Sequence, residues 1–197
     1  MKEEKIKILG FVGPSGCGKD TAARYLSEKF PNKYHYVKLC TTRPQRNEED
    51  NGYIFLDPAV FLEQVLNGDM LNAQEFRGWY YGLNNQGLNP DKINLLPMSD
   101  KMVEQMTEEN NSKYDLKIVY IFTEDKQRLL HILQREEKPD CKEICRRFLT
   151  DIDDYNNNDR LWSCCYMAIE NNYNDKFYFN LPITAGNCFE GDEGKII

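Results

Sequence analysis

The chain has 197 residues, enough for one domain with a full hydrophobic core, and its 41% hydrophobic and 12% aromatic content excludes a disordered protein. The net charge of −7 argues against a nucleic-acid polymer as partner, because contact with a phosphate backbone requires a basic surface. No apolar run approaches the ~20 residues of a membrane span, so we expect no membrane partner and a cytoplasmic location.

The first predicted elements are a buried strand over residues 6–12 and a helix behind residue 20, joined by a glycine-rich loop. The loop sequence GPSGCGK fits the phosphate-binding pattern G-x-x-x-x-G-K. Glycines let backbone N–H groups turn toward an anion at a helix N-terminus, and Lys19 adds a point charge for the outer phosphates. The pattern predicts that ATP phosphates bind to Gly13, Pro14, Ser15, Gly16, Cys17, Gly18, Lys19, Asp20 and Thr21.

Asp20 departs from this pattern, since it stands where a serine or threonine hydroxyl usually holds Mg²⁺. A carboxylate oxygen is a good hard ligand for Mg²⁺ at ~2.1 Å, so we expect Asp20 to bind the metal. The disadvantage is a fixed negative charge beside the β-phosphate.

The rest of the chain alternates predicted strands and helices, which is typical of an α/β fold with a central parallel sheet flanked by helices. The predicted strands are 34–42, 53–56, 70–76, 79–83, 93–98, 117–123 and 164–169. The predicted helices are 57–68, 99–110, 124–136 and 141–157. We expect a single domain over residues 1–197, with a loosely held tail at about 181–197.

Three segments resemble the monophosphate site of guanylate kinases. They are residues 40–46 (CTTRPQR), 51–55 (NGYIF) and 76–82 (FRGWYYG), and their order and spacing match that family. With the loop at 13–19, the resemblance covers roughly residues 6–172. It implies a P-loop kinase with a β-rich insert at about 38–90 that binds the monophosphate and a lid at about 134–147. The sequence GKDT is also similar to the loop of some phage deoxynucleotide kinases.

The resemblance implies a phosphate clamp for the acceptor nucleotide, formed by Arg43, Arg46, Tyr53 and Tyr81. The chemistry suits this role, because two guanidinium forks can bind one phosphate while two phenols donate to its oxygens. The resemblance also implies lid arginines that close over the donor phosphates, at Arg135, Arg146 and Arg147. Asn171 stands where similar kinases contact the donor adenine.

The predicted base pocket differs from that of the family, in which a glutamate and two serines bind guanine. The aligned positions here are Asn72, Leu39 and Leu83, and Ser99 lies nearby. An amide offers one donor and one acceptor, which suits the alternating edge of thymine, uracil or adenine, and also N1–H and O6 of guanine. A register slip would bring Glu75 into the glutamate position, but regular strand alternation puts it on the opposite face.

Three functions remain open from the sequence. The first is a kinase that transfers the ATP γ-phosphoryl group to a nucleoside monophosphate, GMP or dGMP by family resemblance, with Mg²⁺ as cofactor. The second is a catalytically silent guanylate kinase-like module that binds a phosphopeptide. The third is a P-loop enzyme with another phosphorylated acceptor, which leaves the Arg–Tyr clamp unexplained. The retained loop glycines and Lys19 favour the first, acting as a monomer or weak dimer.

Overall fold

The structure is a computed structural model that describes residues 5–45, 52–76, 78–108, 113–134, 139–156 and 158–190. Its strands are β1 (Ile6–Val12), β2 (Tyr34–Tyr36), β3 (Leu39–Thr41), β4 (Tyr53–Phe55), β5 (Met70–Phe76), β6 (Trp79–Asn84), β7 (Ile93–Pro97), β8 (Tyr114–Phe122) and β9 (Met167–Glu170). Its helices are α1 (Lys19–Lys29), α2 (Pro58–Leu66), the short 3-10 turn η1 (Asn85–Gly87), α3 (Asp100–Glu108), α4 (Asp125–Gln134), α5 (Cys141–Asn156), α6 (Asp159–Cys164) and α7 (Asp175–Glu190).

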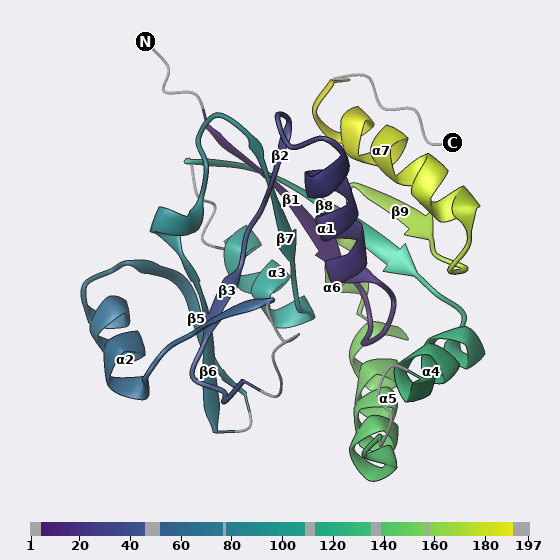
Figure 1. The fold of residues 1–197 in the computed structure, drawn as a ribbon, viewed down its shortest axis with the longest axis horizontal. Helices are drawn as coiled ribbons and strands as arrows, with labels where there is room; N and C mark the ends of the chain where they lie inside the picture. Colours follow the sequence, from purple (N-terminus) through teal and green to yellow (C-terminus); the bar gives the residue numbers. More distant parts are fainter. Residues whose placement is uncertain are drawn as a thin grey trace.

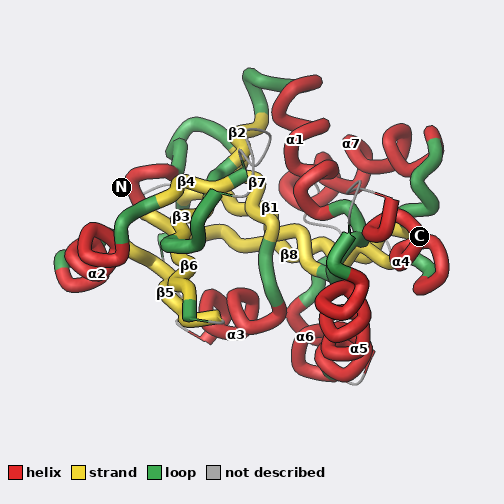
Figure 2. The backbone as a smooth tube through the Cα atoms, turned by 60° about the horizontal axis from the view of Figure 1, so that its bottom comes forward, coloured by secondary structure: helices red, strands yellow, loops and turns green. Residues whose placement is uncertain are grey.

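The main sheet has five strands in the order β2-β7-β1-β8-β9, and every neighbouring pair is parallel. β1 lies at the centre, where Ile8 pairs with Asn94 on one side and with Leu116 on the other. From Ile8 to Val12, β1 is buried and apolar on both faces, as expected for a central parallel strand. Helices cover the two faces (Figures 1 and 2). The predicted fold class, an α/β protein with a central parallel sheet flanked by helices, is confirmed.

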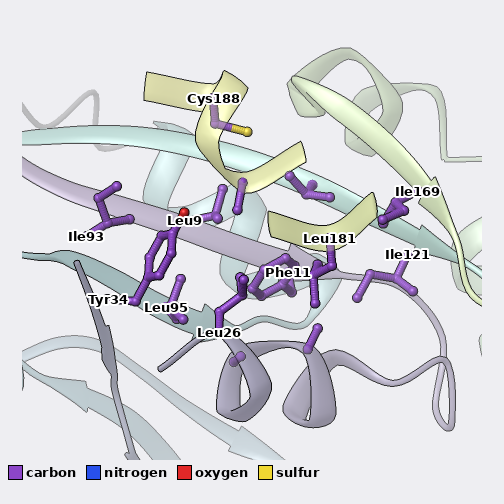
Figure 3. Packing of buried hydrophobic residues seen from close by; sticks show 14 of the residues in the cluster. Leu9, Phe11, Leu26, Tyr34, Ile93, Leu95, Ile121, Ile169, Leu181 and Cys188 are labelled. Atoms are coloured by element: carbon purple, nitrogen blue, oxygen red, sulfur yellow. The ribbon is translucent and has the colours of Figure 1, made fainter. Parts of the chain in front are cut away.

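Each face of this sheet has its own hydrophobic cluster. One cluster joins β1, β7 and β8 to α1 and α7 and includes Leu9, Phe11, Leu26 and Leu181 (Figure 3). The other includes residues of α3, α5 and α6. The phosphate-binding loop leaves β1 at the edge where all five parallel strands end, the position at which open α/β sheets bind their ligands.

The prediction of a loosely held tail from residue 181 is wrong for its described part. Residues 181–190 belong to α7, which packs on β9 and α1, while residues 191–197 lie outside the described residues. Pro182 lies inside this helix, where it has no N–H to donate to the preceding turn. The buried positions Phe177, Leu181, Ala185 and Cys188 recur at helical spacing, so this stripe overrides the proline.

We expect Leu181→Ala to lower the free energy of unfolding by about 2–5 kcal/mol, because the side chain is fully buried in the core. The matched control is Phe179→Ala in the same helix, where the side chain is 72% exposed and a change within about 0.5 kcal/mol is expected. Urea unfolding followed by circular dichroism measures both. Equal stabilities of the two variants would show that α7 does not stabilise the core.

Two other predicted strands differ from the structure. The strand predicted over 34–42 is two strands in different sheets, because the chain crosses between them at Val37, whose N–H donates to the Leu95 carbonyl at 3.0 Å. The strand predicted to begin at Cys164 begins at Met167. The preceding residues form α6, whose first turn is capped by the side chain of Asn158.

A second sheet, in the order β4-β3-β6-β5, lies beside the main one and includes the three segments that resemble the monophosphate site. β5 and β6 form the predicted antiparallel pair. α2 begins after Asp57, whose side chain accepts from the Ala59 N–H, and it attaches to the sheet through Phe61, whose ring stacks on Tyr80 at 5.6 Å. Within the described ranges, no helix combines the length and the apolar character needed to cross a membrane.

Candidate functional site

The loop between β1 and α1 has the backbone geometry of a phosphate cradle. Gly13, Gly16 and Gly18 all have positive φ, at 147°, 83° and 98°. A Cβ at Gly13 would lie 2.6 Å from the Ile121 carbonyl oxygen, and one at Gly18 would lie 2.5 Å from Asn171 Nδ2. Only glycine avoids both the strain and the clash, so this conformation explains the spacing of the motif.

Three side chains from the ends of neighbouring strands hold this loop in place. Thr123 Oγ1 and Asn171 Nδ2 both donate to the Cys17 carbonyl, at 3.3 and 2.8 Å. The Tyr173 hydroxyl donates to the Gly16 carbonyl, and its ring stacks on His131 at 4.3 Å. Asn171 is 3% exposed, and its Oδ1 also accepts from the Tyr173 N–H. Its side chain therefore supports the loop, and its contact with a donor adenine stays a prediction.

Lys19 lies on the first turn of α1 with its ammonium group folded over the loop. Nζ donates to the carbonyls of Gly13 at 2.6 Å and Pro14 at 3.1 Å. This places the cation on the concave side of the loop, at the N-terminus of α1, where the helix dipole also favours an anion. Thr21 is exposed on the same turn and lines a surface groove of about 390 Å³ between α1 and Tyr178.

Asp20 lies between the loop and the second sheet. Its carboxylate is exposed and accepts from the Tyr36 hydroxyl at 3.3 Å. Burial raises the pKa of Tyr36, and the Asp20 carboxylate raises it further. The phenol therefore stays protonated and remains a hydrogen-bond donor. An accessible carboxylate beside a phosphate cradle fits Mg²⁺, which is usually held by one or two carboxylates together with substrate phosphates and water.

The acceptor clamp predicted from the sequence is assembled around Arg43. Its guanidinium lies over the rings of Tyr53 and Phe55, at 5.4 and 5.3 Å, and donates to the Pro44 carbonyl. The Tyr53 and Tyr81 rings meet edge to face at 6.0 Å. The structure thus brings Arg43, Tyr53 and Tyr81 together, while Arg46 lies outside the described residues.

Two threonines fix the backbone that carries Arg43. Thr41 Oγ1 accepts from the Arg43 N–H at 3.1 Å and donates to the Tyr80 carbonyl at 3.0 Å. Thr42 Oγ1 accepts from the Tyr80 N–H at 2.9 Å. Both threonines are buried, so the strand pair β3 and β6 gives the arginine a rigid base.

Charged groups from three parts of the chain act on the hydroxyl of Tyr53: the start of α1, the predicted acceptor clamp and α5. The pKa of its hydroxyl is raised to about 12, first by burial, then by Asp20 and Tyr81, while Arg43 and Arg147 oppose the rise. A small cavity of about 20 Å³ lies here, lined in part by Asp20, Tyr36, Leu39 and Tyr53. This volume holds about one water molecule.

The predicted lid arginines do not behave alike. Arg147 lies within electrostatic range of Tyr53, whereas Arg146 forms an exposed ion pair with Glu143 of its own helix at 3.0 Å. Adjacent helical residues point in directions about 100° apart, so the two arginines leave α5 on different sides, and the lid role of both stays a prediction. Arg135 lies outside the described residues, as does the segment 135–138 of the predicted lid.

The predicted base-pocket residues lie on β3, β5, β6 and the start of α3. Asn72 is 5% exposed and pairs across the sheet with Leu83, which is fully buried. Asn72 Nδ2 donates to the side-chain carbonyl of Gln105 on α3. Gln74, on the same face of β5, donates weakly to Ser99 Oγ at 3.5 Å. Gln105 was not predicted, and its place one and a half turns into α3 gives no sequence signal.

The structure gives no register slip that would bring Glu75 into the base pocket. An irregularity lies between Met70 and Asn72, but pairing is regular from Asn72 through Glu75, which pairs with Tyr80. Glu75 is exposed and on the other face of the strand from Asn72. Asn72, and not Glu75, therefore lies on the buried face of β5, and its contact with a base stays a prediction.

Two further charged residues contact the loop and were missed by the sequence predictions. Asp151 of α5 accepts from the Ser15 N–H at 2.9 Å, and Arg128 of α4 pairs with Asp151 at 3.0 Å. A signal was present, because Arg128 lies four residues before Ile132 and Asp151 three residues after Phe148, on the apolar stripes of their helices. Charges on such stripes indicate a buried pair or a site.

The comparisons with known proteins agree on one family. A family model described as Guanylate kinase matches residues 5–181. The guanylate kinase of Nostoc sp. is 42% identical over 78 residues, 39% of either chain. That of Helicobacter hepaticus is 38% identical over 97 residues, 46% of this chain and 48% of the relative. These matches thus span less than half of the curated relatives.

A solved structure, the crystal structure of guanylate kinase from Anaplasma phagocytophilum, aligns with 93% of this chain and 85% of its own, at a TM-score of 0.60 and 15% identity. At this identity the likeness shows the fold alone. The family model, however, spans most of the chain, and the phosphate-binding loop and the acceptor strands lie within it. This protein therefore belongs to the guanylate kinase family.

Proposed function

We propose that the protein is an ATP-dependent nucleoside monophosphate kinase. The bond between the γ-phosphorus and the bridging oxygen of ATP breaks, a bond to a phosphate oxygen of the monophosphate forms, and the products are ADP and a nucleoside diphosphate. Such a transfer needs positioning and charge neutralisation rather than a covalent intermediate with the protein. The proposal also takes residues 1–197 as one domain with an acceptor insert and a lid.

One observation carries the proposal: groups assigned to donor, acceptor and lid all act on Tyr53. Asp20 and Tyr53 line the same small cavity, the Arg43 guanidinium lies 5.4 Å from the centre of the Tyr53 ring, and the charge of Arg147 of α5 also acts on the pKa of this hydroxyl. Because electrostatic influence falls with distance, these groups share one small region. A transfer between two phosphates requires such proximity, since both must lie within one shielded volume.

The roles follow from the chemistry of each side chain. The loop amides and Lys19 hold the donor phosphates, and Lys19 offsets the charge that develops on the transferred group. Arg43 and the phenols of Tyr53 and Tyr81 orient the acceptor phosphate, with Arg46 as a second guanidinium. Arg147, and by the same proposal Arg135, offset charge on the donor side when the lid closes.

Mg²⁺ is the cofactor that the donor set favours. Asp20 would hold it from the first turn of α1, and the Tyr36 hydroxyl keeps the carboxylate oriented. When bound, the ion neutralises phosphate charge and orients the donor oxygens. Asp20 supplies a negatively charged oxygen ligand at the position where a serine or threonine would supply a neutral hydroxyl oxygen.

We propose that the acceptor base is not restricted to guanine. Asn72 and Gln105 present side-chain amides instead of a carboxylate, and an amide pairs with a base edge that alternates donor and acceptor. Thymine and uracil offer N3–H and O4, adenine an amino group and a ring nitrogen, and guanine N1–H and O6. The buried Leu83 removes a hydroxyl that would serve guanine, which costs about 1–3 kcal/mol per unpaired polar atom.

The test is a panel of all nucleoside and deoxynucleoside monophosphates with ATP and Mg²⁺, followed by ADP release. The proposal expects turnover with at least one of them. ATP binding without turnover on any monophosphate would favour a P-loop enzyme with another acceptor. Absence of ATP binding, with binding of a phosphorylated peptide, would favour a silent module.

We expect Arg43→Ala to raise KM for the monophosphate and lower kcat, while KM for ATP stays nearly unchanged. A charge-assisted hydrogen bond contributes about 1.5–3 kcal/mol, which corresponds to roughly 10–100-fold in kcat/KM. The matched control is Lys92→Ala, a cation outside the site whose ammonium donates to the Pro31 carbonyl. Steady-state kinetics with each substrate varied in turn measures the effect. A change confined to the KM for ATP would contradict the clamp assignment.

A further inference from the structure

A buried ion pair connects α4 and α5 at the donor loop. Arg128 is 1% exposed and Asp151 is 14% exposed, and Arg128 Nη1 lies 3.0 Å from Asp151 Oδ2. The same Asp151 oxygen accepts from the Ser15 N–H at 2.9 Å, and Arg128 Nη1 donates to the Ser15 carbonyl at 3.3 Å. The peptide groups on both sides of Ser15 Cα are therefore held by opposite charges.

Several further contacts hold the Arg128 guanidinium inside the protein. Its second terminal nitrogen pairs with Asp125 at 2.8 Å, and its guanidinium lies 4.2 Å from the centre of the Phe148 ring. Its Nε is buried and has no hydrogen-bond acceptor among the residues that the structure describes. Desolvation makes such a charge expensive, so a buried arginine at this place requires an explanation beyond stability.

Negative charge accumulates around Asp151. Burial raises the pKa of Asp154, and the charges of Asp100 and Asp151 raise it further, so these carboxylates interact electrostatically. At the loop itself, burial raises the pKa of the Cys17 thiol; Lys19 and Arg128 oppose that rise, and Asp151 adds to it. Arg128 and Asp151 thus act with opposite sign at the floor of the donor loop.

Asp151 presents a difficulty for a loop that binds phosphates, because an uncompensated carboxylate repels a polyanion. We propose that Arg128 is a positioning residue that neutralises Asp151 and so sets the affinity of the loop for a nucleoside triphosphate. Asp151 in turn fixes Ser15 to α5, the helix that carries Arg147. The inference rests on the proposed function in one respect, namely that ATP is the ligand of the loop.

The test compares three variants with the wild-type chain. They are Arg128→Met, Asp151→Asn and the double variant, and calorimetric titration measures the Kd for ATP with Mg²⁺ and, separately, for the preferred monophosphate. Asparagine keeps an oxygen that accepts from the Ser15 N–H, so besides the charge it changes only the long contact of 3.4 Å between Ser15 Oγ and Asp151 Oδ1. The matched control is Asp125→Asn, which removes the other carboxylate from Arg128 without touching the loop.

Arg128→Met is expected to raise the Kd for ATP by at least about tenfold, which is 1.4 kcal/mol, and to leave the Kd for the monophosphate within about twofold. The double variant is expected to recover ATP binding to within about threefold of wild type, because no unpaired charge remains. Asp151→Asn alone is expected to bind ATP several-fold more tightly, and Asp125→Asn about as well as wild type.

Three results would overturn the inference. Unchanged ATP affinity in a folded Arg128→Met variant would show that the pair is structural only. A double variant as weak as Arg128→Met would show that Arg128 acts without Asp151, for instance by direct contact with phosphate. If Arg128→Met does not fold, Asp151→Asn decides, since equal or weaker ATP binding contradicts the proposal. Absence of ATP binding in the wild type would instead overturn the proposed function.

Discussion

Lys19→Ala is expected to lower kcat by about 10²–10³-fold while the protein stays folded. The ammonium group offsets charge on the transferred phosphoryl group, and no other described lysine lies on the loop. The fold should tolerate its loss, because Nζ donates only to the carbonyls of Gly13 and Pro14 and to the Cys17 sulfur. Initial rates of ADP release at saturating substrates measure kcat, and the urea midpoint measures stability.

Lys29→Ala is the matched control for this prediction, since it removes the same side chain at the opposite end of α1. Lys29 is exposed, and its ammonium contacts Tyr25 away from the loop. Its kcat should equal that of wild type. If Lys19→Ala also turned over at the wild-type rate, the donor site would have to lie elsewhere in the chain.

Asn72→Glu combined with Leu83→Ser is expected to move activity toward GMP and dGMP. A carboxylate accepts from the N1 and N2 donors of guanine, and a site built to pair particular base atoms rejects other bases by up to ~10⁴-fold. Before the change, we expect no monophosphate to exceed the others by the hundredfold, about 2.7 kcal/mol, that a strict guanine site would give. Ratios of kcat/KM across the monophosphate panel measure the shift.

Two control variants test whether the shift in base preference comes from recognition at Asn72. Glu75→Gln changes a carboxylate on the exposed face of the same strand and should leave base preference unchanged. Because Leu83 is fully buried, Asn72→Glu alone separates recognition from the stability lost by Leu83→Ser. A wild-type enzyme that used GMP at least about a hundredfold better than any other monophosphate would show that Asn72 does not set specificity.

The sequence predicted the donor loop well because its information is local. Three glycines and a lysine at fixed spacing after an apolar run require one backbone path, and Gly13, Gly16 and Gly18 all adopt the positive φ that the pattern implies. The Arg43, Tyr53 and Tyr81 cluster was predicted through family resemblance, and the structure brings them together. That this cluster binds a phosphate stays a prediction, as do the roles of Arg46 and Arg135.

What the sequence did not predict depends on contacts between distant segments. The apolar stripes indicate that Arg128 and Asp151 are each buried, but the two are 23 residues apart, and no local pattern predicts that their charges meet at Ser15. The helix at residues 175–190 was missed for another reason, since a loosely held tail was predicted there and the apolar stripe of the segment was not used. Tertiary burial overrode local propensity in that segment.

The central position of β1 has a consequence for how the protein folds. β1, which ends in the glycine-rich loop, is synthesised before β7 and β8, yet its Ile8 pairs with Asn94 and Leu116, far along the chain. Closing such long loops costs entropy before the contacts are gained, so pairing is slow. Until β7 and β8 emerge from the ribosome, the apolar faces of β1 stay exposed, which makes the nascent chain prone to aggregation and a ligand for chaperones.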